Sequence, residues 1–305
     1  MTSAHASVKK RRMSRLAMKE ALAGYLYIAP LVLGLSLFYI LPALASLYIS
    51  LTDWNGFTSM NWIGLDNYAN LFSDDRFVRS LRNTFVYTII VVPIAISIAT
   101  VLAVMLNQRI RGVTVYRLIY FLPVVTMPVA VAMIWKWLYH SEYGLINQVL
   151  GAVGLPTPMW LLDQRFTLLS IALVGIWSVF GNYTVILLAG LQSISSTYYE
   201  AAELDGAGTI RKFFHVTLPL LTPSLFFVLV ISLINTLQVF DLVFMMARDS
   251  NMIEASRTLV YSVWENAFQF TRMGYASAQA WILFILIMII TIIQMIGQKK
   301  WVHYQ

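Results

Sequence analysis

An apolar stretch near residues 166–191 contains two polar side chains that a helix would bring together. Ser178 and Asn182 are four residues apart and therefore share one helix face, with Trp177 and Tyr183 beside them. Polar side chains within membrane spans usually face a cavity or another helix, so these groups could hydrogen-bond a polar solute. The alternative is hydrogen bonding between packed helices, which enriches Asn, Gln and Ser without any ligand.

A second row of polar side chains lies in the apolar stretch near residues 220–246. Asn235, Gln238 and Asp241 recur every three residues, and Thr236 is adjacent to the first of them. Asp241 is near the outer end of the stretch, where it could instead form a salt bridge or line the mouth of a cavity. A carboxylate with no base in the middle of a span favours a neutral solute over an anionic one.

The chain lacks the motifs of common catalytic and nucleotide-binding sites. It has no Cys, no G-x-x-x-x-G-K-[ST] phosphate loop, no H-E-x-x-H zinc motif and no G-x-S-x-G nucleophile turn. Its four His residues are scattered over the termini and loops. No catalytic or metal-binding residue is therefore predicted, and the energy for any transport must come from an ion gradient or from another chain.

The elements that carry the polar rows are predicted to be membrane-spanning helices. Of the 305 residues, 59% are hydrophobic and 11% are charged, against about a quarter charged in a typical soluble domain. Residues 21–52 contain no Asp, Glu, Lys or Arg, and about 20 apolar residues suffice for one span. The apolar runs are too long and alternate too little for barrel strands. We predict an all-α polytopic membrane protein with six spans, near residues 22–50, 83–106, 115–139, 166–191, 220–246 and 273–297, and with kinks at Pro93, Pro123 and Pro128.

The distribution of Lys and Arg predicts that both termini are cytoplasmic. Six of the 21 bases lie in the first 20 residues, and 13 in all fall on the cytoplasmic side in this orientation. A basic tail (1–21), the segment 192–219 and a C-terminal tail (299–305) then lie inside, and the six-helix domain covers 22–298. The basic tail could be a nucleic-acid arm or a targeting signal. Attraction to an anionic membrane leaflet is the simpler explanation, so contact with membrane lipid and none with nucleic acid is expected.

The first apolar run also follows basic residues, as in a secretory signal peptide. It is about twice as long as the 7 to 15 apolar residues of a cleavable signal, so it is predicted to remain as the first span. In the outer segment that follows it, a short surface helix is predicted to begin at Asp74 or Asp75, with Phe77 and Leu81 on one face. That helix is either interfacial without a partner or a docking surface for an external protein.

The cytoplasmic segment 192–219 is unusually charged and is predicted to form two helices. The first is capped by Ser195 or one of the two residues after it, and Gly206 is placed to end it in a left-handed conformation. Thr209 can cap a second short helix, which Pro219 stops before the fifth span. By these features alone the segment could also be an ordinary amphipathic surface loop.

The spacing within this segment resembles the EAA loop of the permease subunits of ABC importers. Glu-Ala-Ala at 200–202 is followed after three residues by Gly206, which is followed after nine residues by Val216. Val216 stands where Ile is usual and Ser195 where Pro is common, and both departures are mild. The resemblance implies that the segment docks on a separate ATPase through Glu200, Ala201, Ala202, Asp205, Gly206, Ala207, Leu218 and Pro219.

Similarity to the maltose and glycerol-phosphate branch of these permeases extends over nearly the whole chain, in the runs YIAP, DWNGF, GLDNY, FLPVVTMP, EYGLIN and RMGYASAQAW. It implies the type I ABC importer transmembrane fold in a bacterial or archaeal cytoplasmic membrane. A second homologous permease would complete the path, two ATPase subunits would bind ATP and Mg, and an extracytoplasmic solute-binding protein would deliver the substrate. No cofactor is expected in this chain. The resemblance also implies a substrate path lined by Ser178, Asn182, Asn235, Thr236, Gln238 and Asp241.

The predicted function is a permease subunit that forms half of the path for a neutral sugar or oligosaccharide and couples to its ATPase through the EAA loop. The first alternative is a permease of the same class for glycerol phosphate or a related polar solute. An ion-coupled secondary transporter would need internal repeats and intramembrane ionisable residues, and Asp241 is the only acid within a predicted span. A membrane scaffold without a transport role is the third interpretation.

Overall fold

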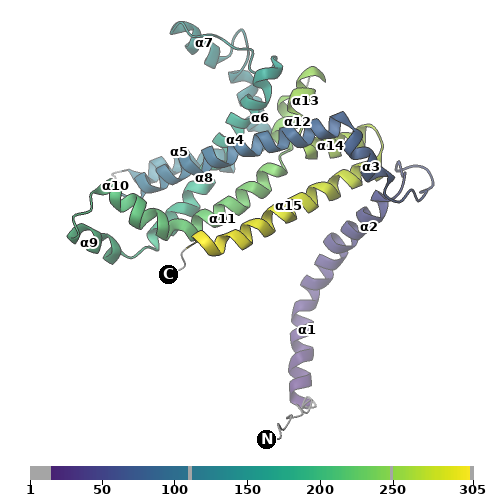
Figure 1. The fold of residues 1–305 in the computed structure, drawn as a ribbon, viewed down its shortest axis with the longest axis horizontal. Coiled ribbons are helices and arrows are strands. Elements are labelled where there is room, and N and C mark those ends of the chain that lie inside the picture. The colour runs from purple at the N-terminus through teal and green to yellow at the C-terminus, as the bar shows by residue number, and fades with distance from the viewer. Residues whose placement is uncertain (1–14, 109–111, 248–249, 303–305) are drawn as a thin grey trace, which may run out of the picture. The chain divides into compact units, whose positions relative to one another are not determined.

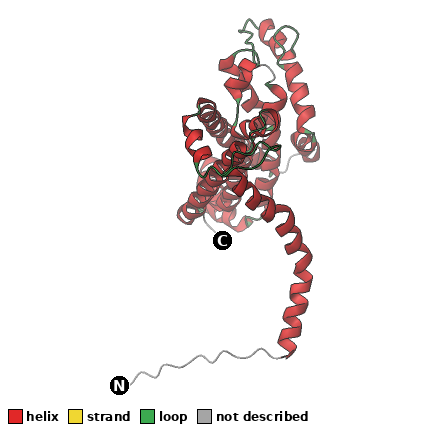
Figure 2. Ribbon diagram, turned by 90° about the vertical axis from the view of Figure 1, so that its right-hand side faces the viewer, coloured by secondary structure: helices red, strands yellow, loops and turns green. Residues whose placement is uncertain are grey.

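The computed structural model describes residues 15–108, 112–247 and 250–302 (Figure 1). Residues 1–14 of the predicted N-terminal tail (1–21) lie outside the described residues. The chain divides into two units, Met1–Ile49 and Ser50–Gln305, which are considered separately. Within the described ranges every regular element is a helix, and Figure 2 shows the same arrangement from the side. The predicted all-α fold is confirmed.

The first unit is a single apolar helix that begins before the predicted span. Its parts are α1 (Arg15–Leu35), the π-helical turn η1 (Ser36–Ile40) and α2 (Leu41–Ser50), whose last residue already belongs to the second unit. At 36 residues it is long enough to cross a membrane. Its apolar side chains are exposed along the described helix, as expected of a span that meets lipid or another chain.

The second unit is a bundle built on long apolar helices. Its four longest elements are α4 (Asp75–Leu106), α8 (Gln164–Gln192), α11 (Leu218–Leu237) and α15 (Met273–Trp301). Helices α4 and α8 pack along much of their length, and α11 packs on both of them and on α15. The shorter helices are α3 (Asp66–Ser73), α5 (Val113–Val125), α6 (Pro128–Leu138), α7 (Leu145–Ala152), α12 (Asp241–Met246), α13 (Ser250–Ser256) and α14 (Leu259–Trp264), followed by the π-turn η3 (Glu265–Gln269).

Small residues allow the closest helix contacts in this bundle. A Cβ atom at Gly181 of α8 would collide with the backbone carbonyl of Tyr120 in α5, and one at Gly190 would collide with the side chain of Ser224 in α11. Small residues at helix interfaces are typical of membrane bundles, where packing replaces the hydrophobic effect between helices. The glycines of α8 therefore set its distance to two neighbouring helices.

Two of the six predicted spans are interrupted in the structure. The predicted span 115–139 consists of α5 and α6, because Met127 before Pro128 adopts an extended backbone with a ψ of 133°. The predicted kink at this proline is thus a complete break. The predicted span 220–246 ends at Leu237 and resumes as α12. Five described helices are long and apolar enough to cross a membrane, instead of six: Thr209–Leu237 still qualifies, whereas the break before Pro128 leaves only shorter helices.

The predicted short surface helix is not a separate element. It forms the first turns of α4, which continues without interruption to Leu106. Asp74 is the N-cap and accepts a hydrogen bond from the backbone N–H of Arg76 at 2.8 Å, so the predicted starting point is confirmed. Phe77 is fully buried and packs in a hydrophobic cluster with Leu71 and Leu259. The face with Phe77 therefore packs inside the chain, and whether the remaining surface of this segment docks an external protein stays a prediction.

Candidate functional site: a polar pocket and an exposed helical element

A cavity of about 390 Å³ lies between α4, α5, α6, α8, α11 and α12. All six side chains predicted to line a substrate path contribute to its wall: Ser178, Asn182, Asn235, Thr236, Gln238 and Asp241. The structure thus brings together two rows of polar residues that are more than fifty positions apart in the sequence. Their roles in transport stay a prediction.

These six side chains differ in how available they are to a solute. The hydroxyl of Ser178 donates to the carbonyl of Val174, and that of Thr236 donates to the carbonyl of Ser232, both at 2.8 Å. Within the described part of the chain the side chains of Asn182 and Gln238 form no hydrogen bond. The amides are therefore better candidates for solute contacts than the two hydroxyls, whose donors are occupied in their own helices.

The pocket has a buried wall of two tyrosines, of which the sequence pattern indicated Tyr183, beside the first polar row, and missed Tyr87. Tyr87 of α4 and Tyr183 of α8 are 3% and 1% exposed, and both side chains line the cavity. The Tyr183 hydroxyl faces the amide of Asn235 and has no partner in hydrogen-bonding geometry among the described residues. Because Tyr183 follows Asn182 directly, the sequence carried a signal for it, whereas nothing near Tyr87 distinguishes it from other apolar residues of its span.

The break between α11 and α12 forms part of the pocket wall. Gln238, Val239 and Phe240 connect the two helices, and all three line the cavity. Asp241 then occupies the first turn of α12, where a carboxylate suits the positive end of the helix dipole. An interrupted helix is tolerated at membrane depth where it lines a cavity. The polar residues of the second row are thus presented by a helix end and not by a continuous helix.

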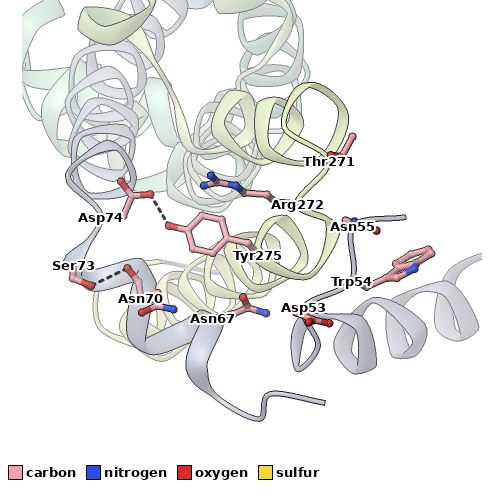
Figure 3. A pocket seen from close by; sticks show the side chains of 10 residues that line it. All are labelled: Asp53, Trp54, Asn55, Asn67, Asn70, Ser73, Asp74, Thr271, Arg272 and Tyr275. Atoms are coloured by element: carbon pink, nitrogen blue, oxygen red, sulfur yellow. Dashed lines mark hydrogen bonds between the residues drawn. The ribbon is translucent and has the colours of Figure 1, made fainter. Parts of the chain in front are cut away.

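A second pocket lies at the other side of α4, beside the loop that follows α2. It has a volume of about 440 Å³, and Figure 3 shows its lining of Asp53, Trp54, Asn55, Asn67, Asn70, Ser73, Asp74, Thr271, Arg272 and Tyr275. Its polar groups mostly bind one another: the Tyr275 hydroxyl donates to Asp74 at 2.6 Å, and the Asn67 amide donates to two backbone carbonyls at 2.8 Å. We interpret this pocket as the structured junction of the loops at this end of the bundle.

The predicted helical element of segment 192–219 is present at one end of the bundle (Figure 1). Its first helix is α9 (Ser196–Leu204), and the Ser195 hydroxyl accepts a hydrogen bond from the Thr197 N–H at 3.3 Å, which confirms the predicted cap. Gly206 has a φ of +75°, as predicted for the residue that ends this helix. The N–H groups of Gly206 and Ala207 donate to the carbonyls of Glu203 and Ala202, which is the Schellman pattern.

The second half of the element differs from the prediction in two ways. Gly208, not Thr209, occupies the N-cap of α10 (Thr209–Lys212). Pro219 does not stop the helix, because a π-helical turn η2 (Phe213–Thr217) joins α10 directly to α11. The N–H of Leu218 bonds to the carbonyl of Phe213, five residues back, and this widened turn accommodates the proline that follows. The same sequence of a π-turn, one Leu and a Pro occurs at η1.

The two short helices of the element are tied together but leave much of their surface exposed. Lys212 forms an ion pair with Glu203 at 2.6 Å, and the Tyr199 hydroxyl is 3.2 Å from that of Thr217. Of the residues predicted to dock on an ATPase, Glu200, Ala201, Asp205 and Gly206 are exposed, while Ala202, Ala207, Leu218 and Pro219 are half-buried. Leu204 and Ile210 are 90% and 76% exposed. These two apolar side chains were not predicted, although their position inside a charged segment could have indicated a contact surface.

A bundle of apolar helices around a polar pocket, with an exposed helical element at one end, defines a multi-span membrane permease. The chain belongs to the family described as the inner membrane component of binding-protein-dependent transport systems, which it matches over residues 68–301. The predicted family is confirmed. The chain is accordingly the permease subunit of an ABC importer, a transport component rather than an enzyme, and neither an ion-coupled transporter nor a scaffold.

Individual relatives cover almost the whole chain. It is 37% identical to the probable ABC transporter permease protein YesP of Bacillus subtilis, over 98% of this chain and 96% of the relative. It is 34% identical to the sulfoquinovosyl glycerol transport system permease protein SmoG of Agrobacterium fabrum, over 89% of both chains. It is 30% identical to the sn-glycerol-3-phosphate transport system permease protein UgpA of Yersinia pestis, over 92% of this chain and 95% of the relative.

The fold is similar to that of a solved importer. A chain of a bacterial ABC transporter involved in the import of the acidic polysaccharide alginate superimposes with a TM-score of 0.83 at 22% identity, over 94% of this chain and 99% of that one. A chain of the same kind of transporter, in complex with a periplasmic protein bound to an alginate pentasaccharide, gives a TM-score of 0.81 at 21% identity, over 91% of this chain and 94% of that one. The predicted importer fold is thereby confirmed.

Proposed function

We propose that this chain forms half of the translocation path for a neutral sugar or oligosaccharide. The observation that carries the proposal is the composition of the 390 Å³ cavity. Amides, tyrosines and one carboxylate line it, and the described residues of its wall include no Lys, Arg or His. Amide groups beside aromatic rings suit the hydroxyls and apolar faces of a sugar. The solute contacts would come first from Asn182 and Asn235, then from Ser178, Thr236, Gln238 and Asp241.

The second candidate substrate is glycerol phosphate or a related polar solute. The name of the UgpA relative favours it. The carboxylate of Asp241 in the pocket wall opposes it, since an anion would meet a like charge there in the absence of a compensating base. A second permease chain would contribute the rest of the path and could supply such a base.

A partner permease is needed because the pocket is incomplete in one chain. Asn235, Gln238 and Asp241 line the cavity and yet are exposed. A second, homologous permease packed on this side would enclose them. We place both termini and segment 192–219 on the cytoplasmic side of a bacterial or archaeal cytoplasmic membrane, and the loops around α3 on the side of the extracytoplasmic binding protein.

Coupling to a separate ATPase dimer would occur through Glu200, Ala201, Ala202, Asp205, Gly206, Ala207, Leu218 and Pro219. ATP and Mg would be bound by those partner subunits, and this chain would hold no cofactor. The helix from Thr209 to Leu237 is continuous and therefore connects this element to the pocket directly. From Thr209 to Asn235, 26 positions apart, its length is about 39 Å at 1.5 Å per residue.

The substrate class can be tested with the assembled importer in liposomes. ATP hydrolysis would be measured with the binding protein present, across neutral mono- and oligosaccharides and glycerol phosphate. We expect stimulation and uptake with at least one neutral sugar and none with glycerol phosphate. Stimulation by glycerol phosphate alone would overturn the proposed substrate class and favour the second candidate.

A further inference from the structure

A partly buried cluster of charged side chains lies at the end of the bundle opposite the helical element 192–219 (Figure 1). Arg257 is 3% exposed and its guanidinium forms ion pairs with Glu254 at 2.8 Å and with Glu265 at 3.0 Å. Arg76 at the start of α4 lies 3.5 Å from the same oxygen of Glu254. Burial opposes the charge of Arg257, but the hydrogen bonds and charges of the two glutamates outweigh it and raise its pKa. The cluster pairs two bases with two acids.

The backbone around Arg257 is fastened to α4. The side-chain amide of Asn83 donates to the carbonyl of Arg257 at 3.1 Å, and the N–H of Leu259 donates to the hydroxyl of Thr84 at 2.8 Å. Residues 256–259 are all at most 3% exposed. This short connection between α13 and α14 is therefore one of the most firmly held segments of the outer loops.

One further hydrogen bond reaches from this segment to the pocket. The hydroxyl of Thr258, which is fully buried, donates to the carbonyl of Val239 at 2.9 Å. Val239 lies in the break between α11 and α12 and lines the 390 Å³ cavity. No proline occurs between residues 224 and 305, so the break is not imposed by a proline. A carbonyl at an interrupted helix needs a partner, and Thr258 provides it.

Stability alone does not explain the charged cluster. A buried ion pair is weak evidence for stability, because well-packed apolar side chains often do as well in the same place. The Arg257 Nε–H and the second carboxylate oxygen of Glu254 are buried without a hydrogen-bond partner, so the cluster is not fully satisfied. Ion pairs that fix the position of the connection between α13 and α14, at some cost in stability, are more consistent with a positioning role for Arg257.

We infer that Arg257 and Thr258 are positioning residues for the substrate path. Arg257 fixes the connection between α13 and α14, and through Thr258 this connection holds the helix break at Val239. The break in turn sets the positions of Gln238 and Asp241 on the pocket wall. The role in transport rests on the proposed function, whereas the anchoring itself can be measured without any transport.

The experiment uses the absence of cysteine from the chain. A single reporter, Gln238→Cys, would be introduced into the assembled importer in liposomes, and its rate of modification by a maleimide would be measured. The Thr258→Val substitution removes the hydroxyl but keeps the shape. We expect Thr258→Val to raise the labelling rate about two- to tenfold. The reason is that the loss of one hydrogen bond lowers the population of the state in which the break at Val239 is anchored by about this factor. Thr258→Ser restores the hydroxyl and should label within twofold of the parent.

Two controls separate anchoring from general loosening. A second reporter, Asn182→Cys, lies in the same pocket on α8 and should label at the same rate with and without Thr258→Val. Thr100→Val removes a buried hydroxyl that bonds only within α4 and should leave both reporters unchanged. If Thr258→Val fails to assemble, Arg257→Lys, which keeps the charge but not the two-pronged contact, should raise labelling at position 238. Unchanged labelling at 238, or an equal increase at 182, would overturn the inference, whatever the outcome of the sugar panel.

Discussion

Replacement of Gly206 by proline should separate ATP hydrolysis from transport. Gly206 has a φ of +75°, and its N–H donates to the carbonyl of Glu203 at 3.0 Å. Proline fixes φ near −65° and has no N–H, so it can adopt neither the conformation nor the hydrogen bond of this turn. The lost hydrogen bond costs about 1 kcal/mol and the left-handed backbone cannot be kept at all, so the end of α9 must leave its present position.

A graded series makes this expectation quantitative. Gly206→Ala keeps the N–H and meets no atom within 4 Å, so its only cost is the left-handed backbone, roughly 1 to 2 kcal/mol. That lowers the population of the native turn about 5- to 30-fold relative to competing conformations. Gly208→Ala is the matched control, since Gly208 has a φ of −70° and open space around it. Its effect should be negligible.

The assay is the number of sugar molecules imported per ATP hydrolysed by the reconstituted importer. We expect this ratio to be unchanged for Gly208→Ala, reduced for Gly206→Ala and near zero for Gly206→Pro, with similar amounts of each variant in the membrane. Normal coupled uptake by Gly206→Pro would refute the argument that the turn transmits motion between the two chains. An equal loss in Gly208→Ala would show that any change in this segment is disruptive.

Three further expectations concern other parts of the chain. Asn182→Ala and Asn235→Ala should each lower the maximal rate of sugar uptake about two- to tenfold, the effect of one lost hydrogen bond, with the amount of assembled importer unchanged. Asp241→Asn should raise the ATPase response to glycerol phosphate relative to neutral sugars, because it removes a negative charge from the pocket wall. Burial opposes the charge of Asp74, but hydrogen bonds from Tyr275 and the start of α4 outweigh it and lower its pKa. Its stabilising contribution should thus be full above about pH 4 and be lost as the pH falls further, and thermal unfolding of Asp74→Asn in detergent should lack this dependence.

The sequence was sufficient where a local rule decides the structure. The left-handed turn at Gly206 and the caps at Ser195 and Asp74 follow from residue type and position. Helical spacing and the high cost of polar groups within spans identified each polar row, and the resemblance to importer permeases implied that the two rows line one pocket. These features depend on a few neighbouring residues and so can be read from one chain.

It was insufficient where distant residues decide. The break at Val239 depends on Thr258, nineteen positions away, and no local signal marks it. The fifth span predicted from hydropathy, 220–246, continues across this break because the residues on both sides are apolar. Likewise, Pro219 would end the helix if the preceding turn had α-helical hydrogen bonds. The preceding turn, 213–217, is a π-turn, and the helix continues through the proline.

These two departures from the prediction have one mechanical consequence. The helix from Thr209 to Leu237 has no break, so a displacement of the element that carries Glu203 and Lys212 must move Asn235 with it. Beyond Leu237 the helix is interrupted, and the interruption is held at Val239 by the hydrogen bond from Thr258. We therefore expect motion from the ATPase side to change the distance between Asn235 and Asp241 more than that between Asp241 and Thr258. In that case the width of the pocket changes at the break between α11 and α12, because residues 238–240 of this break form part of the pocket wall.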